Sequence, residues 1–113
     1  MGELIVDFVA KDPWQMVLVA EGPWAEVSVG LAQLQDRLYA CLDAAIDGQL
    51  ADQFPDSSGQ LVTLRVDCYS VPQVETEEFF SHFSSAALQL PDYKAALAAS
   101  PHVSGIKFAI NFG

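Results

Sequence analysis

Basic residues are scarce in this chain. Only five of its 113 residues are Lys or Arg, against 15 Asp or Glu, so the formal net charge is −10. A field of this sign repels the phosphates of nucleic acids and the headgroups of anionic membranes, whereas it speeds encounter with a basic protein surface. The sequence therefore argues against nucleic-acid and membrane partners and favours a basic protein as a partner.

Long apolar runs and a secretion signal are also missing. No run approaches the roughly 18 apolar residues of a membrane span. Residues 1–8 include Glu3 and Asp7 but no Lys or Arg, unlike the basic start of a secretory signal. The two cysteines, Cys41 and Cys68, fall at predicted core positions, which is typical of buried thiols in a reducing compartment. We therefore expect a cytoplasmic protein.

Sequence motifs for catalysis, metal binding and nucleotide binding are lacking as well. The chain has no G-x-S-x-G elbow, no Gly-rich phosphate loop and no zinc spacing of Cys and His. His82 and His102 are far apart in the sequence, and nothing places either beside a Ser or Cys nucleophile. We predict no catalytic residue, no metal and no cofactor, and the sequence leans away from an enzyme.

Apolar residues, by contrast, are abundant. They make up 51% of the chain, and the mean hydropathy is +0.24, which excludes a disordered protein. A chain of 113 residues is long enough to bury one core without disulfide or metal support. We predict a single domain over residues 1–113.

The strongest structural signal is the stretch from Trp24 to Leu50, which has the pattern of one long amphipathic helix. Apolar residues recur there at steps of three and four, which places them on one side of a helix. Gly22 and Pro23 precede the stretch, and Gly48 stands where a left-handed C-terminal cap is expected. The predicted buried side consists of Val27, Leu31, Leu34, Leu38, Cys41, Leu42 and Ala45.

Two polar features mark the same helix. Asp36, Asp43 and Asp47 project within roughly 40° of one another, away from the leucines. The helix dipole disfavours the acids near the C-terminal end, so this acidic stripe is either a solvated face or a docking surface for a basic partner. Gln35 falls inside the apolar arc, where a buried amide needs hydrogen-bond partners. It is predicted to be a structural polar anchor or a ligand contact.

The remaining patterns predict an α+β fold. Thr76 is a candidate N-cap for a second helix whose buried face includes Phe79 and Phe83, and a short helical piece follows Pro91. The element order is β-β-α-β-α-β, so we expect a two-layer sandwich, with two main helices on one face of a four-stranded sheet. The predicted strands are 4–10, 14–20, 61–69 and 106–112.

The predicted hairpin of the first two strands is apolar on both faces. On one face, Ile5 and Val9 flank Asp7 in the first strand, and Val17 with Val19 follows in the second. Antiparallel strands with one wetted face alternate more cleanly than this. The two strands are therefore either central in the sheet or present a second face for self-association. On the second interpretation the dimer face consists of Ile5, Val9, Val17 and Val19.

Several segments together resemble a family of small uncharacterised bacterial proteins, a domain of unknown function. The resemblance begins with a Trp before the long helix and continues with the run L-x-x-L-Q-D-R-L-Y at 31–39, G-Q-L at 48–50, and Pro55 and Gly59. It includes the strand ending in Cys68, then Pro72, the pair at 79–80 and the closing strand to 112. Arg37 stands where the family usually has Lys. The resemblance supports the element order and implies no activity.

These observations favour a non-enzymatic, cytoplasmic protein-interaction module. We expect a homodimer formed through the hairpin face and a basic partner bound by the acidic stripe. One variant is an immunity-type inhibitor of a basic toxin, for which an acidic surface provides electrostatic steering. The competing interpretation is a small-ligand binder or minor enzyme, with Trp14, Trp24 and Gln35 lining a cleft between helix 25–47 and the sheet.

Overall fold

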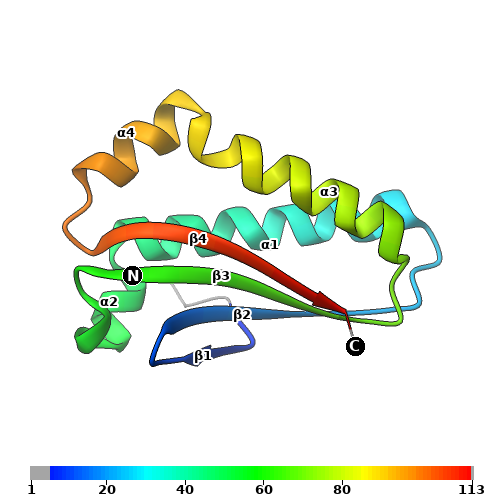
Figure 1. Ribbon diagram of the computed structural model, residues 1–113, viewed down its shortest axis with the longest axis horizontal. Helices are drawn as coiled ribbons and strands as arrows, with labels where there is room; N and C mark the ends of the chain where they lie inside the picture. The colour runs from blue at the N-terminus through cyan, green and yellow to red at the C-terminus, as the bar shows by residue number, and fades with distance from the viewer. Residues whose placement is uncertain (1–5, 113) are drawn as a thin grey trace.

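A four-stranded mixed sheet forms one layer of the protein in the computed structural model, which describes residues 6–112 (Figure 1). The strands are β1 (Phe8–Ala10), β2 (Trp14–Glu21), β3 (Gln60–Tyr69) and β4 (Val103–Phe112), and they lie in this order across the sheet. β1 pairs with β2 antiparallel, whereas β2, β3 and β4 run parallel to one another. The predicted hairpin is confirmed, and β2 is central.

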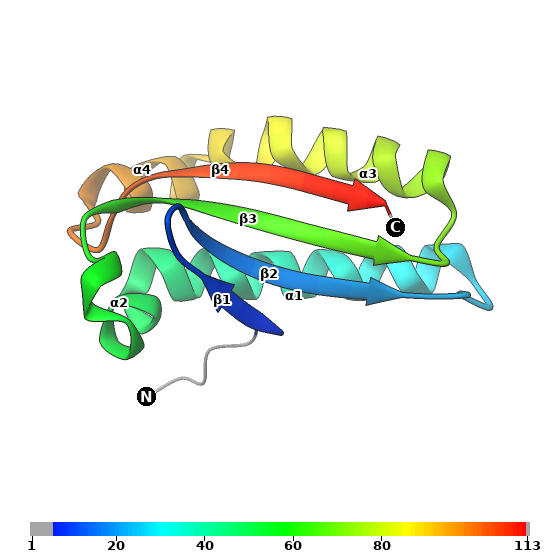
Figure 2. The same cartoon turned by 60° about the horizontal axis from the view of Figure 1, so that its bottom comes forward.

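The helices form the second layer. α1 (Val27–Asp47) joins β2 to β3, and α3 (Gln73–Ala86) joins β3 to β4, so both are crossover helices between parallel strands. With the sheet turned toward the viewer, the strands lie in front and both helices lie behind them (Figure 2). The predicted α+β sandwich, with its main helices on one face, is confirmed. The shorter elements are α2 (Gln49–Gln53), η1 (Pro55–Ser57), η2 (Ala87–Gln89) and α4 (Pro91–Ala99).

The long helix α1 occupies most of the stretch predicted to be helical. It ends at Gly48, whose φ of 99° is the left-handed conformation that glycine adopts most easily. A Cβ at this position would lie 2.7 Å from the ring of His102, so the close approach also requires glycine. Gly48 is therefore the C-terminal cap that the sequence predicts, and the chain turns there into the separate short helix α2.

The core lies between α1 and the inner face of the sheet. Leu34, Leu38 and Leu42 of α1 are at most 2% exposed, and they pack in one cluster with the inward-facing residues of β2 and β3. The predicted strand 61–69 is confirmed, and every second residue from Val62 to Cys68 is buried. The sheet residues of this cluster are Met16, Leu18, Ala20, Val62, Leu64, Val66 and Cys68.

The later elements differ from the prediction at their ends. α3 begins at Gln73, three residues before the predicted N-cap Thr76. The N-cap residue is Pro72. Thr76 is therefore inside the helix and fully buried. β4 begins at Val103 rather than 106, and it lies parallel to β3 as its direct neighbour. Hydrophobic alternation did not reveal these additional residues, because Ser104 and Gly105 interrupt the apolar pattern.

A polar clamp closes the edge of β2 beyond the short strand β1. The N–H of Val19 donates to Asp7 Oδ2 at 2.6 Å, and Arg37 Nη1 of α1 donates to the carbonyl of Val19 at 3.0 Å. Arg37 Nη2 also donates to Asp7 Oδ2 at 2.7 Å. Asp7 and Arg37 therefore replace the strand partner that β1 is too short to provide.

Candidate functional site

The structure does not bring Trp14, Trp24 and Gln35 together in one cleft. Trp14 begins β2, whereas Trp24 follows the other end of that strand. The Trp24 ring packs on Gly30 of α1, so closely that a Cβ on Gly30 would overlap the indole. The three residues instead line separate hollows. Core side chains fill the space between the middle of α1 and the sheet, and only a small hollow of about 120 Å³ beside Trp24 remains at one end.

The prediction that Gln35 is a buried amide is wrong. Its side chain is exposed and lines a shallow hollow between α1 and α3, beside Tyr39 and Phe79. Ile46 lies on the same arc of the helix but is covered, since Ser100 Oγ donates to its carbonyl at 2.7 Å. α4 and the loop after it cover only the C-terminal part of this arc, so Gln35 stays in contact with solvent.

The acidic stripe of Asp36, Asp43 and Asp47 is exposed along α1. Asp43 accepts a hydrogen bond of 2.8 Å from the hydroxyl of Tyr93 on α4. Burial, followed by this hydrogen bond, raises the pKa of Tyr93 well above its ordinary value. One of the three carboxylates therefore also holds α4 against α1, which accounts for an acid in an unfavourable position near the end of the helix.

The four residues predicted as a dimer face do not face together. Val9 pairs with Met16 and so lies on the helix-covered side of the sheet, whereas Phe8 pairs with Val17. Val17 and Val19 are on the opposite side, which no helix covers, but Val17 is fully buried there. The pairing register reverses the first strand relative to the prediction, because directly opposed residues in antiparallel strands share a face. Ile5 lies outside the described residues.

The face of the sheet turned away from the helices carries a polar network across three strands. Arg65 of β3 donates to Asp67 at 3.1 and 3.0 Å and to Gln15 of β2 at 2.7 Å. Asn111 of β4 donates to Asp67 at 3.1 Å. We call this side, made by the outward residues of β1 to β4, the open face. Thr63, Arg65 and Asp67 alternate with apolar residues in the sequence, which is typical of side chains on the outward face of a strand, but their partners on other strands depend on sheet register.

Large apolar side chains surround this network. Phe8, Leu61 and Tyr69 are 47%, 42% and 48% exposed, and the strand registers place all three on the open face. Arg65 and Lys107 balance Asp67 and Glu21 in formal charge on the same face. The open face therefore combines exposed apolar area with zero net charge, whereas the whole chain carries −10.

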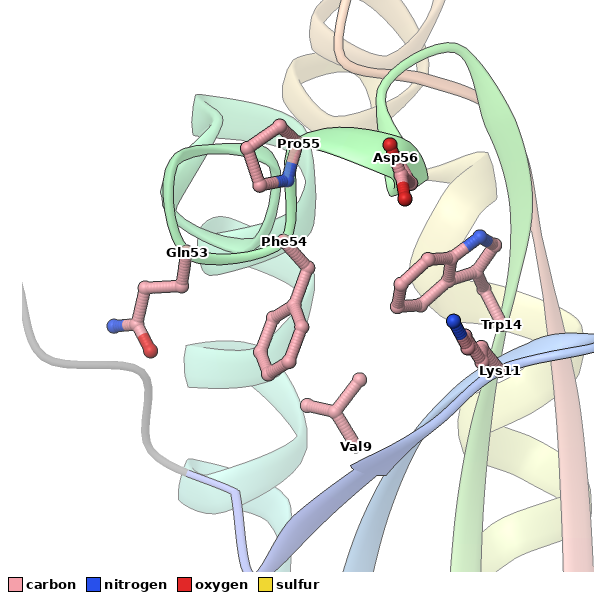
Figure 3. Close-up of a pocket in the computed structure, with 7 residues that line it drawn as sticks. All are labelled: Val9, Lys11, Trp14, Gln53, Phe54, Pro55 and Asp56. Carbon is pink, nitrogen blue, oxygen red and sulfur yellow. The ribbon is translucent and has the colours of Figure 1, made fainter.

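A second feature is a hollow of about 440 Å³ between the hairpin and the segment 53–56 (Figure 3). Trp14 stands on one side of it, and Phe54 and Val9 form the other. The rings of Trp14 and Phe54 are 5.9 Å apart at 61°, an edge-to-face contact. Lys11 and Asp56 lie on the Trp14 side. Of these residues the sequence singled out only Trp14 as a ligand contact, because Phe54 and Asp56 belong to a polar loop without a motif.

The two cysteines are parts of the core. Burial raises the pKa of Cys41 from 9.0 to about 12 and that of Cys68 from 9.0 to about 11. Both are 1% exposed. At neutral pH these thiols stay protonated and out of contact with solvent, and a protonated, inaccessible thiol is a poor nucleophile.

Residues 6–112, the part of the chain that the structure describes, contain neither a metal-binding cluster nor a membrane-spanning helix. In this range no group of three or more His, Cys, Asp or Glu side chains is placed to hold a metal ion. No helix in the same range has both the length and the apolar character to cross a membrane. Comparison with protein-family models, curated proteins and solved structures found no match to this chain. The family resemblance therefore stays a prediction.

Proposed function

We propose that this protein is a non-enzymatic protein-interaction module that self-associates through the open face. The observation that supports the proposal is that Phe8, Leu61 and Tyr69, all exposed, lie on a sheet face that no helix covers (Figure 2). A sheet face without helices that carries exposed apolar side chains offers apolar area for a partner to bury. The hairpin thus contributes to the proposed interface through Phe8, not through Val9.

The charge distribution favours a second copy as the partner on this face. Two molecules that each carry −10 repel one another, and the repulsion is smallest where the approaching surfaces are neutral. The open face meets this condition. Its Arg65 and Lys107 can also approach Asp67 and Glu21 of the other copy in a two-fold arrangement, because such an interface pairs each patch with itself.

The size of the open face sets the expected affinity. β2, β3 and β4 are 8, 10 and 10 residues long. With strands about 4.8 Å apart and a rise of about 3.3 Å per residue, they present roughly 400–500 Å². A stable interface buries about 800 Å² per partner. We therefore expect a weak dimer, with a dissociation constant that is roughly micromolar or higher.

Sedimentation velocity over roughly micromolar to millimolar concentrations would test the dimer. The wild-type protein should change from monomer to dimer in this range, and Tyr69→Glu should stay monomeric. Val74→Glu is the matched control, since Val74 is 65% exposed on α3, in the other layer. A wild-type protein that stays monomeric throughout contradicts the proposal, as does a Val74→Glu variant that loses the dimer while Tyr69→Glu keeps it.

We further propose that the acidic stripe on α1 binds a basic protein, of which a basic toxin would be one example. Its exposure on the outer side of the helix layer supports this interaction. Asp36→Lys with Asp47→Lys should abolish capture of the partner at low salt, and Asp43 is left intact because it binds Tyr93. Glu77→Lys with Glu78→Lys makes the same charge change on α3 and should retain capture. Equal loss in both double variants would contradict a specific role for the stripe and indicate a general charge effect.

A further inference from the structure

The hollow beside the hairpin has walls suited to an apolar group. Trp14, Phe54, Val9 and Pro55 line an open hollow of about 440 Å³, a volume within the range of about 300–1,000 Å³ found for small-molecule sites. The two aromatic rings meet edge to face, so their mutual contact holds both walls in place. An apolar or aromatic side chain of a ligand would lie in the hollow against the contacting rings of Trp14 and Phe54 and against Val9 (Figure 3).

Opposite charges accompany these walls. Lys11 is in the turn between β1 and β2, and Asp56 is in η1, so two separate segments bring an ammonium and a carboxylate to the same hollow. Both side chains lie on the Trp14 side of it (Figure 3). Neither has a hydrogen-bond or ion-pair partner among residues 6–112. Their charges are therefore available to a ligand.

We propose that this hollow binds a free α-amino acid with an apolar or aromatic side chain. The ligand carboxylate would pair with the Lys11 ammonium, and the ligand ammonium with the Asp56 carboxylate, while the side chain packs in the hollow against the rings of Trp14 and Phe54. A ligand with only one charge leaves either Lys11 or Asp56 without a partner. The site thus selects a zwitterion attached to an apolar group. It is independent of self-association, because Val9 and Trp14 point to the helix-covered side of the sheet, away from the open face.

Titration with four probes, followed by amide chemical shifts, would test the proposal. L-phenylalanine has all three groups, whereas 3-phenylpropionate lacks the ammonium, 2-phenylethylamine lacks the carboxylate and glycine lacks the apolar side chain. L-phenylalanine should bind best and shift residues around Trp14 and Phe54. Each of the other probes should have a dissociation constant at least about fivefold higher than that of L-phenylalanine. This is the loss of affinity expected when one partly solvated charge pair or one apolar contact is missing.

Charge-removing variants locate the binding groups. Lys11→Met should lower the affinity for L-phenylalanine about fivefold and leave the affinity for 2-phenylethylamine unchanged. Asp56→Asn should also lower the affinity for L-phenylalanine about fivefold, but leave the affinity for 3-phenylpropionate unchanged. Lys94→Met and Asp92→Asn on α4 make the same charge changes outside the hollow and should leave every affinity unchanged. No binding of L-phenylalanine at millimolar concentration would overturn the proposal. Equal affinity of the singly charged probes would refute the role of the zwitterion, and shifts confined to other surfaces would refute the site.

Discussion

The clamp at the edge of β2 allows a stability prediction worked from its geometry. Asp7→Ala removes the acceptor of the Val19 N–H, at 2.6 Å, and of Arg37 Nη2, at 2.7 Å. Each hydrogen bond contributes about 1 kcal/mol net, and more when one group is charged. The side chains of Arg37 and Asp7 are 34% and 41% exposed, so solvent screens their ion pair. Water can also replace part of the lost hydrogen bonding. We expect Asp7→Ala to lower the free energy of unfolding by about 1–2 kcal/mol.

A double-mutant cycle separates the ion pair from the backbone contacts. Arg37→Ala removes the donor to the Val19 carbonyl, at 3.0 Å, and should cost about 1 kcal/mol. The double variant should lose less than the sum of both, with a coupling of about 0.5–1 kcal/mol, since either single change already breaks the shared bond. Urea denaturation followed by far-ultraviolet circular dichroism measures all four proteins. Lys94→Ala, an exposed charge without a described partner, is the control and should change stability by less than about 0.5 kcal/mol. Fully additive losses would refute the clamp as one unit.

Three further changes test the packing and the surface. Gly30→Ala should destabilise by about 1–3 kcal/mol and shift the fluorescence of Trp24, whose ring the new methyl would overlap; unchanged emission would contradict this contact. Because burial raises the pKa of Cys41 and Cys68 from 9.0, stability should be constant below about pH 8.5 and fall as the pH rises toward about 11, where only the unfolded chain ionises fully. Denaturation at pH 8 and 10 measures the loss, which Cys68→Ala should reduce. Gln35→Leu should stay within about 0.5 kcal/mol of wild type in the same assay, and a larger loss would reveal a polar contact at this exposed position.

The element types and their order could be predicted from the sequence because local periodicity carries that information. Buried positions recur every second residue in β3, and at steps of three and four in α1. Gly48 ended the helix as predicted, since few other residues adopt its backbone conformation at low cost. These features depend on residues close together in the chain.

The candidate sites depend on residues that are far apart in the chain, and there the sequence was less informative. Val9 was predicted on the wrong face of the sheet. Alternation within β1 does not say which residue of β2 lies opposite Val9, because the register of the hairpin decides this pairing. Gln35 has the helical phase of a core residue but is exposed, because α4 and its following loop cover only the other end of the same arc. A periodic pattern gives the direction of a side chain and says nothing of what lies opposite it.

By itself, then, the sequence determined the fold class, the order of its elements and the acidity of the surface, each of which follows from composition or from spacing within one element. Only the tertiary structure decided which distant segments contact each face of the sheet and of the helices. It left one face of the sheet without helices, joined Asp7 to Arg37 across 30 residues, and brought Lys11 near Asp56 beside Trp14. The physical reason is that a strand's register and a helix's cover depend on contacts between distant segments, whose free energies no local pattern records.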